Sequence, residues 1–360
     1  MGFFDVIQAI IALTVIVLAH ELGHFLAAKW AKIEVREFSV GFGPMLISWG
    51  GDKEGEEKAE GEMVKTVYGW RLFPLGASVR MTGEEIGDAP SPYSYSSKTP
   101  FQKAVVAVSG PLMNLLVAML VFIFVFSIYG KDELVNIPVI GYVVPNGPAE
   151  KVGIKPNDRI ITVNGKHVAS WDQSVSAIQG QPKDKTIQLK VERNKKTLVF
   201  NVKPQWDPMA ESYYIGIMAS TRAVKVGIVE ANKIGFKATY DITARILKSF
   251  KLLVTGGVSK DDMGGPIRIA QLMGGEAHKG LLELVWLTAV ISINLGVFNL
   301  LPIPALDGSR IVFAIIEVVR RRPVEPEKEN MVHLVGLVFL LALIFLVTVN
   351  DVWRIIKEAL

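Results

Sequence analysis

The chain contains no cysteine and only five histidines among its 360 residues, and its first lysine or arginine is Lys29. Without cysteine it can form no disulfide, no thiolate metal ligand and no cysteine nucleophile, although either side of a membrane stays open to it. The apolar start lacks the basic n-region and the cleavage site of a signal peptide, which indicates a retained segment. Lysine and arginine are scattered and the net charge is only +4, which argues against nucleic acid as a partner.

Apolar residues, by contrast, make up 50% of the chain, and the mean hydropathy of +0.34 is high for a protein that lies wholly in water. Four segments are long and apolar enough to cross a bilayer, which takes about 20 residues of α-helix. They are Phe3–Ala28, Lys103–Tyr129, Leu281–Leu301 and Val332–Val349. We therefore predict a polytopic α-helical membrane protein with four transmembrane helices.

The connections between these helices differ in character. Basic residues mark cytoplasmic loops, and they flank the first loop and lie in the third: Lys29, Lys32, Arg36, Lys98, Arg310 and Arg320–Arg322. Alternating apolar residues at Glu37–Trp49 and Thr66–Met81, around the acidic stretch Gly50–Gly61, predict a membrane-associated β-rich layer in the first loop. After the second helix come strand patterns at Val139–Val144, Arg159–Val163, Thr186–Glu192 and Thr197–Val202, and a helix at Trp171–Gln179 with Ser170 as its N-cap.

Eight segments describe the predicted organisation. They are a first transmembrane helix (1–30), a cytoplasmic β-rich loop (31–102), a second helix (103–129), a β-rich module (130–206), an amphipathic region (207–280), a third helix (281–303), a cytoplasmic loop (304–331) and a fourth helix with a C-terminal tail (332–360). Apolar residues of Val224–Val254 recur at near-helical spacing among basic ones, which fits a helix on the membrane surface or one packed on the neighbouring module.

The strongest motif is His20-Glu21-Leu22-Gly23-His24 in the first apolar segment. Imidazoles four residues apart project from one face of a helix and can bind one metal ion, and a glutamate beside them can accept a proton from water. The pattern also arises by chance, but inside a lipid-compatible helix these groups carry a desolvation cost of several kcal/mol and persist mainly where they bind an ion or line a wet cavity. We predict His20 and His24 as ligands and Glu21 as the catalytic base.

A catalytic zinc needs a third protein ligand. The other histidines are poor choices, since two lie in the soluble region and His333 starts a helix. The segment Asn299–Gly308 supplies a carboxylate, because Pro302 and Pro304 break the third helix, and irregular backbone at the membrane is tolerated only where it is buried in protein or lines a cavity. Asp307 is therefore the predicted third ligand. Zinc is the preferred metal, although two histidines and an aspartate accept other divalent ions.

Two asparagines near these motifs carry alternative interpretations. Asn299 can hold the substrate backbone or an oxyanion, and it can equally make a polar contact between helices. The same alternatives apply to Asn114, in Gly110-Pro111-Leu112-Met113-Asn114.

Six motifs occur in one order along the chain. They are His20-Glu21-Leu22-Gly23-His24, Phe38–Pro44, Pro74-Leu75-Gly76 to Met81, Gly110-Pro111-x-x-Asn114, Gly265-Pro266-Ile267 and Asn299–Gly308. Together they resemble the site-2 protease family of intramembrane metalloproteases, in the bacterial branch of the regulator-of-sigma-factor proteases. The resemblance covers nearly the whole length of the chain.

The resemblance implies a zinc site formed by His20, His24 and Asp307, an essential Glu21, and a multi-pass protein of the bacterial inner membrane with its active site near the cytoplasmic side. It also implies a first-loop strand that pairs with an extended substrate. We assign that role to Leu75, Gly76, Ala77, Ser78, Val79, Arg80 and Met81. Ala77-Ser78 and Ser309 depart from the Gly-Tyr and Gly common in the family, which bears on fine substrate preference.

A second resemblance concerns the β-rich module. Gly147–Ile161, followed by Val163–Lys166, resembles the signature turn of bacterial PDZ domains, so we expect a PDZ domain at 130–206 on the extracytoplasmic side. Such domains bind peptide ends or strands by β-augmentation. In these proteases one can equally act as a size filter, and both roles stay open.

The leading hypothesis is a zinc endopeptidase that cuts transmembrane segments of single-pass membrane proteins already shortened by a site-1 protease, such as an anti-sigma factor or remnant signal peptides. We expect membrane lipids to surround the protein. A non-proteolytic scaffold that gathers partners through its PDZ domain predicts a broken HExxH or Asp307, and both are intact. A tethered soluble-type protease would place HExxH outside the bilayer, whereas the motif lies late in the first apolar run.

Overall fold

The computed structural model describes residues 2–52, 63–84, 91–180, 185–207, 212–255 and 265–359. Most of the acidic stretch predicted between the two first-loop strands lies outside these residues. The chain divides into two compact units. The first comprises 1–125, 232–247 and 259–360, and the second comprises 126–231 and 248–258.

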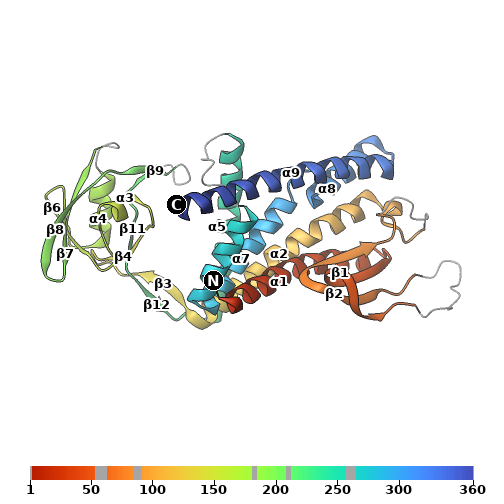
Figure 1. Cartoon of the computed structure of the whole chain (residues 1–360), viewed down its shortest axis with the longest axis horizontal. Coiled ribbons are helices and arrows are strands. Elements are labelled where there is room, and N and C mark those ends of the chain that lie inside the picture. The colour runs from red at the N-terminus through yellow and green to blue at the C-terminus, as the bar shows by residue number, and fades with distance from the viewer. Residues whose placement is uncertain are drawn as a thin grey trace. The chain divides into compact units, whose positions relative to one another are not determined.

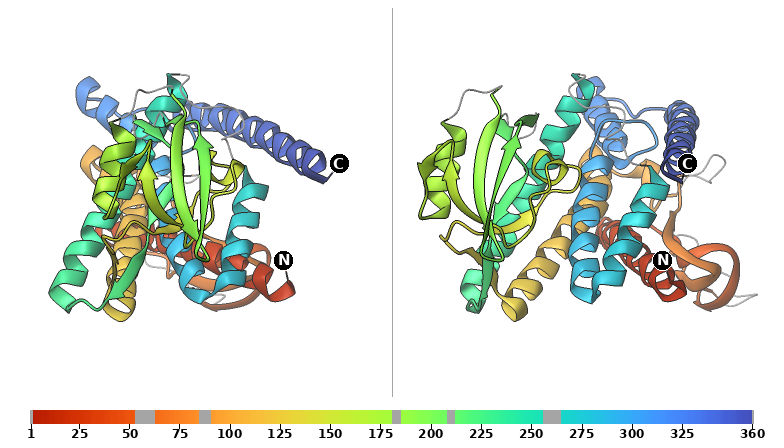
Figure 2. Two further views of the ribbon diagram at one scale, coloured as in Figure 1. Left: turned by 90° about the vertical axis from the view of Figure 1, so that its left-hand side faces the viewer. Right: turned by 60° about the vertical axis from the view of Figure 1, so that its left-hand side comes forward.

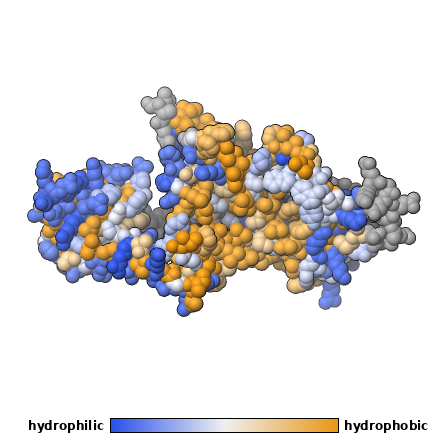
Figure 3. All heavy atoms as spheres, turned by 90° about the horizontal axis from the view of Figure 1, so that it is seen from below, coloured by the Kyte–Doolittle hydropathy of each residue, from blue (hydrophilic) through white to orange (hydrophobic). Residues whose placement is uncertain are grey.

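Helices dominate the first unit (Figure 1). Within the described ranges, four are long and apolar enough to cross a membrane: α1 (Phe3–Trp30), α2 (Pro100–Tyr129), α7 (Leu281–Asn299) and α9, which spans Pro326–Ala359. The surface over these helices is largely apolar, whereas that of the second unit is largely hydrophilic (Figure 3). The predicted class of a four-helix polytopic membrane protein with β-rich insertions is confirmed.

Three further helices accompany these four, and the first of them has residues in both units. They are α5 (Ile228–Val254), α6 (Pro266–Lys279) and α8 (Asp307–Arg320). Residues 304–331 are predicted as a loop from the sequence, and α8 corrects that prediction for Asp307–Arg320. The helix was missed because it is too short and too polar for a membrane span. Its exposed apolar residues nevertheless follow helical spacing, as Val312, Ile315 and Val319 show.

Both predicted strands of the first loop form, as β1 (Val35–Gly50) and β2 (Val67–Met81). Each strand bends near its middle, so that four segments lie side by side in the order 45–50, 67–71, 37–40 and 77–81. Gly76, at φ +84°, marks the bend of β2. Segment 77–81 pairs with 35–40 alone among the described pairings, so it forms one edge of the sheet.

A buried ion pair joins α2 to α8. Lys103 Nζ lies 2.9 Å from one Glu317 carboxylate oxygen and 3.1 Å from the other, and the two residues are 6% and 5% exposed. Removing one partner of such a pair leaves an uncompensated buried charge and costs about 3–5 kcal/mol. We expect Lys103→Met to lower the midpoint of thermal unfolding in detergent more than the double variant Lys103→Met, Glu317→Leu does. Equal midpoints would contradict this account.

The second unit is a β-rich module. Its largest sheet has the strand order β6 (Lys166–His167), β5 (Arg159–Val163), β7 (Ile187–Arg193) and β8 (Lys196–Val202). The other elements are β3 (Lys131–Leu134), β4 (Ile140–Val143), α3 (Pro148–Lys151), α4 (Trp171–Gln179), β9 (Gln205–Asp207), β10 (Ser212–Tyr214), β11 (Ile217–Ala219) and β12 (Thr221–Val224). Figure 2 shows these strands and helices from two further sides. Ser170 caps α4 by accepting from the Gln173 N–H at 3.2 Å, as predicted.

Apolar side chains from the strands and from α4 form a core within this module. Its largest fully buried members are Ile140, Ile160, Ile187 and Leu189. Arg193 clamps the turn before β5, since its guanidinium lies 2.6 Å from Asp158 Oδ1 and donates to the Gly153 carbonyl at 2.7 Å. The module thus has its own core, and it extends beyond the predicted boundary at residue 206, because Ile215 and Ala219 belong to that core and β11 and β12 pair with β4 and β3.

Candidate metal centre

Two helices supply the charged and imidazole groups of the site. His20 and His24 lie one turn apart on α1, are 7% and 9% exposed, and hold their ring centroids 4.8 Å apart. Asp307 begins α8, after the α7 helix has ended at Asn299 and the two prolines have turned the chain. Gly308 lies in the first turn of α8 against the Leu300 and Leu301 carbonyls. A side chain there would collide with that backbone, so glycine permits this close approach.

The three predicted ligands converge. Asp307 Oδ2 lies 3.1 Å from His20 Nε2 and 3.3 Å from His24 Nε2, and the two nitrogens are 3.2 Å apart. Oδ2 is buried and makes no hydrogen bond within the described part of the chain, which is unusual for a carboxylate. Burial acts to raise the pKa of Asp307, but the neighbouring imidazoles outweigh it and hold the pKa below its usual value. A metal ion bound here would take the ionised carboxylate as its ligand.

These separations fit a zinc ion. Nitrogen and oxygen ligands bind zinc at 2.0–2.2 Å in a tetrahedron, which places the ligand atoms about 3.3 Å from one another. The observed separations of 3.1–3.3 Å match that spacing. Among the described residues, this trio is the one group of histidine, aspartate and glutamate side chains close enough to hold a metal.

Hydrogen bonds behind the ligands orient both imidazoles. His24 Nδ1 donates to the Val106 carbonyl of α2 at 2.8 Å, which leaves the Nε2 lone pair for a metal. His20 Nδ1 lies 3.3 Å from the carboxamide nitrogen of Asn114, which is fully buried. The Asn114 oxygen has no partner among the described residues. Turning the amide around lets the His20 Nδ1–H donate to that oxygen and frees Nε2 in the same way. In this orientation Asn114 holds the imidazole of His20 in the tautomer that a metal ligand needs.

A cavity of about 390 Å³ opens onto the trio. Glu21, Asn299, Val79 and Met81 line it together with the ligands, and so do Val17, Leu295, Glu84, Ala305 and Arg310. The remaining predicted substrate residues, which are Leu75, Gly76, Ala77, Ser78 and Arg80, do not line it. Because side chains alternate along a strand, Val79 and Met81 point to the cavity side and Ser78 and Arg80 to the other. Ser78 accordingly bonds Ser39 at 3.1 Å.

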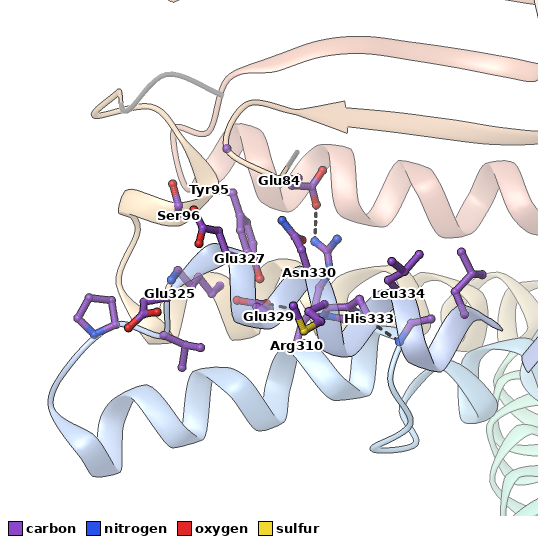
Figure 4. A pocket seen from close by; sticks show the side chains of 17 residues that line it. Glu84, Tyr95, Ser96, Arg310, Glu325, Glu327, Glu329, Asn330, His333 and Leu334 are labelled. Atoms are coloured by element: carbon purple, nitrogen blue, oxygen red, sulfur yellow. Dashed lines mark hydrogen bonds and ion pairs between the residues drawn. The ribbon is translucent and has the colours of Figure 1, made fainter. Parts of the chain in front are cut away.

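Glu84 and Arg310 lie at the site although no sequence motif pointed to them. Their side chains form an ion pair, which Figure 4 shows in the neighbouring pocket of about 940 Å³ that both residues also line. The second Glu84 oxygen accepts from the Met81 N–H at 3.2 Å. Glu84 thereby links the edge segment of β2 to Arg310, which lies on α8 one turn after Asp307. No local sequence pattern indicates this ion pair, because Glu84 and Arg310 are 226 residues apart.

Gly110 allows α2 to approach α1 at the site. A Cβ at this position would meet the imidazole of His24, with Cε1 2.7 Å away. We expect Gly110→Ala to displace the ring and weaken zinc binding by about 10–100-fold, the effect typical of disturbed support around a metal ligand. Competition with a chelator measures this. Gly275→Ala on α6 is the matched control, since nothing lies within 4 Å of its added Cβ. If both variants hold zinc equally, Gly110 has no such role.

Comparison with known proteins gives the site its context. The model of peptidase family M50 matches residues 8–343 of this chain. The chain belongs to peptidase family M50. This confirms the resemblance to the site-2 proteases that the six motifs carried, and it makes the protein a metalloprotease.

Two relatives align over almost their full length. Zinc metalloprotease RasP of Geobacillus kaustophilus is 31% identical over 428 residues, with 97% of this chain and 98% of the relative covered. The regulator of sigma-W protease RasP of Bacillus subtilis is 31% identical over 430 residues, with 97% and 98% covered. One similar solved structure is the PDZ domain of an SdrC-like protein from Listeria monocytogenes, which is 19% identical over 24% of this chain and 92% of that domain, at a TM-score of 0.21.

Proposed function

We propose that this protein is an intramembrane zinc endopeptidase that cuts within transmembrane segments of single-pass membrane proteins. Its substrates are an anti-sigma factor, remnant signal peptides, or both, after a site-1 protease has shortened them. The observation that carries the proposal is one cavity, lined by Glu21 and three convergent ligands, to which two helices apolar enough to span a membrane, α1 and α7, contribute His20, Glu21, His24 and Asn299. The Bacillus subtilis relative, named a regulator of sigma-W protease, supports this substrate class.

His20, His24 and Asp307 hold the metal in this proposal. A zinc ion held there would supply Lewis-acid polarisation of a carbonyl and would lower the pKa of water to about 7. The Glu21 carboxylate accepts the proton of the attacking water and later delivers it to the leaving amine nitrogen. Asn299, at the end of α7 and on the cavity wall, donates from its amide to the substrate backbone.

The edge segment 77–81 holds the substrate extended. A helical transmembrane segment keeps its carbonyls bonded internally, so it must unwind before one of them can react. An edge strand offers unpaired backbone groups to an extended chain, and Val79 and Met81 of this edge line the catalytic cavity. Peptide pairing along Leu75–Met81 would thus present a backbone carbonyl to the site.

The basic residues of the first and third loops support a cytoplasmic position for the active site, in the inner membrane of a bacterium. The module at 130–206 then lies on the extracytoplasmic side. We propose that it is a PDZ domain that either binds a substrate segment or excludes proteins whose ectodomains are still intact.

Cleavage of a single-pass model substrate by the purified, reconstituted protein tests the proposal. We expect products cut inside the transmembrane segment, their loss on treatment with a zinc chelator, and recovery when zinc is restored. A substrate with a large folded ectodomain should be cut more slowly than its shortened form. Failure to cut any membrane substrate, with zinc bound, would favour a scaffold that acts through the module alone.

A further inference from the structure

We propose that α9 positions the metal ligand Asp307 by holding the preceding loop with His333 and Gly336. The inference rests on the proposed function, since it concerns the same metal site. His333 was set aside as a ligand from sequence, and it does not reach the trio. It supports the trio from behind instead.

A hydrogen bond connects α9 to the loop. The Ala305 N–H donates to His333 Nδ1 at 3.1 Å (Figure 4). Ala305 has φ +74°, a left-handed conformation that residues other than glycine rarely adopt and keep only where surrounding structure enforces it. It lies two residues before Asp307. The direction in which the chain enters α8 therefore depends on a strained residue that His333 helps to hold.

The His333 ring touches α8 as well. Its centroid lies 5.7 Å from that of Phe313, which is on the helix that Asp307 begins. Because Nδ1 accepts from Ala305, the neutral ring carries its proton on Nε2. That nitrogen is buried without a hydrogen-bond partner among the described residues, and Glu329 Oε1 is 3.8 Å away. Contacts with the loop and α8 thus fix the position of the ring, and they leave its second nitrogen without a hydrogen bond.

Gly336 lets α9 come close enough for this bond. It lies three residues after His333, on the same face of the helix. A Cβ at this position would meet Pro304, with the carbonyl carbon and oxygen both 2.7 Å away. Any side chain would push α9 off the loop. Most of the apolar α9 surface is exposed, and the contacts with Pro304 and Ala305 are one of the places where α9 is attached.

Variants of this contact separate positioning from general stability. We expect His333→Ala to lower kcat about tenfold with little change in KM, and to lose zinc at about tenfold lower chelator concentration, as disturbed support around a metal ligand does. The midpoint of thermal unfolding should stay near that of the wild type. Gly336→Ala should behave similarly, whereas Gly275→Ala, whose added Cβ meets nothing within 4 Å, should match the wild type.

Two rescues sharpen the test. His333→Asn places an amide oxygen near the position of Nδ1, so it should recover most of the zinc retention. Adding Ala305→Gly to His333→Ala should recover part of it, because glycine adopts a positive φ freely. If His333→Ala retains zinc and activity like the wild type, or if neither rescue restores zinc retention, the inference is wrong. If His333→Ala weakens zinc retention while even the wild type cuts no membrane substrate, the positioning role stands and the proposed function fails.

Discussion

Glu21→Gln is expected to cut the model substrate on the order of 10²–10⁴-fold more slowly than the wild type, which is the range that general acid–base catalysis supplies. The amide is nearly isosteric with the carboxylate but cannot accept a proton at neutral pH. Glu21 lines the catalytic cavity and is not one of the three converging ligands, so the variant should still bind about one zinc per chain. Quantified cleavage products and metal analysis of the same preparation measure both quantities.

The matched control is Glu283→Gln, which changes an exposed glutamate at the start of α7. It should leave cleavage and zinc content unchanged. Should Glu21→Gln retain activity within a few-fold of the wild type, another group takes the proton and the base has been assigned wrongly. If the variant loses its zinc as well, Glu21 supports the metal rather than the proton transfer.

Asp307→Ala is expected to have the second large effect, on zinc itself. It removes the one carboxylate of the trio and leaves two imidazoles as the protein ligands. Changes behind a metal ligand typically cost 10–100-fold in affinity, so loss of the ligand should cost at least about 100-fold. Metal analysis after dialysis should then find far less than one zinc per chain, and cleavage should fall accordingly.

Asp241→Ala serves as the control, because this aspartate pairs with Lys237 on α5 and its side chain is 43% exposed. It should keep its zinc. Asp307→Asn should fall between the wild type and Asp307→Ala, since the amide oxygen coordinates without a charge. Full zinc content in Asp307→Ala would mean that a different residue is the third ligand.

Much of the fold follows from patterns that are local in the sequence. The four apolar helices were found within a few residues of their ends, apart from the longer α9, because the length and hydropathy of a segment suffice to recognise a membrane span. Strands β5, β7 and β8 and helix α4 were equally accessible from alternation and from the Ser170 cap. Helix α8 was not recognised from the sequence. It is short and amphipathic, it begins at Asp307 and ends in a basic cluster, and such a segment resembles a polar loop.

The sequence by itself determined that His20 and His24 lie on one face of a helix with Glu21 next to them, because helical periodicity places residues four apart above one another. It also made Asp307 a candidate through the prolines before it. Only the tertiary structure decided that its carboxylate meets imidazoles 283 and 287 residues away, that Asn114 lies against His20, and that His333 contacts the loop before Asp307. Such contacts depend on how separate helices and a bent strand pack, and no periodicity within one element records that packing.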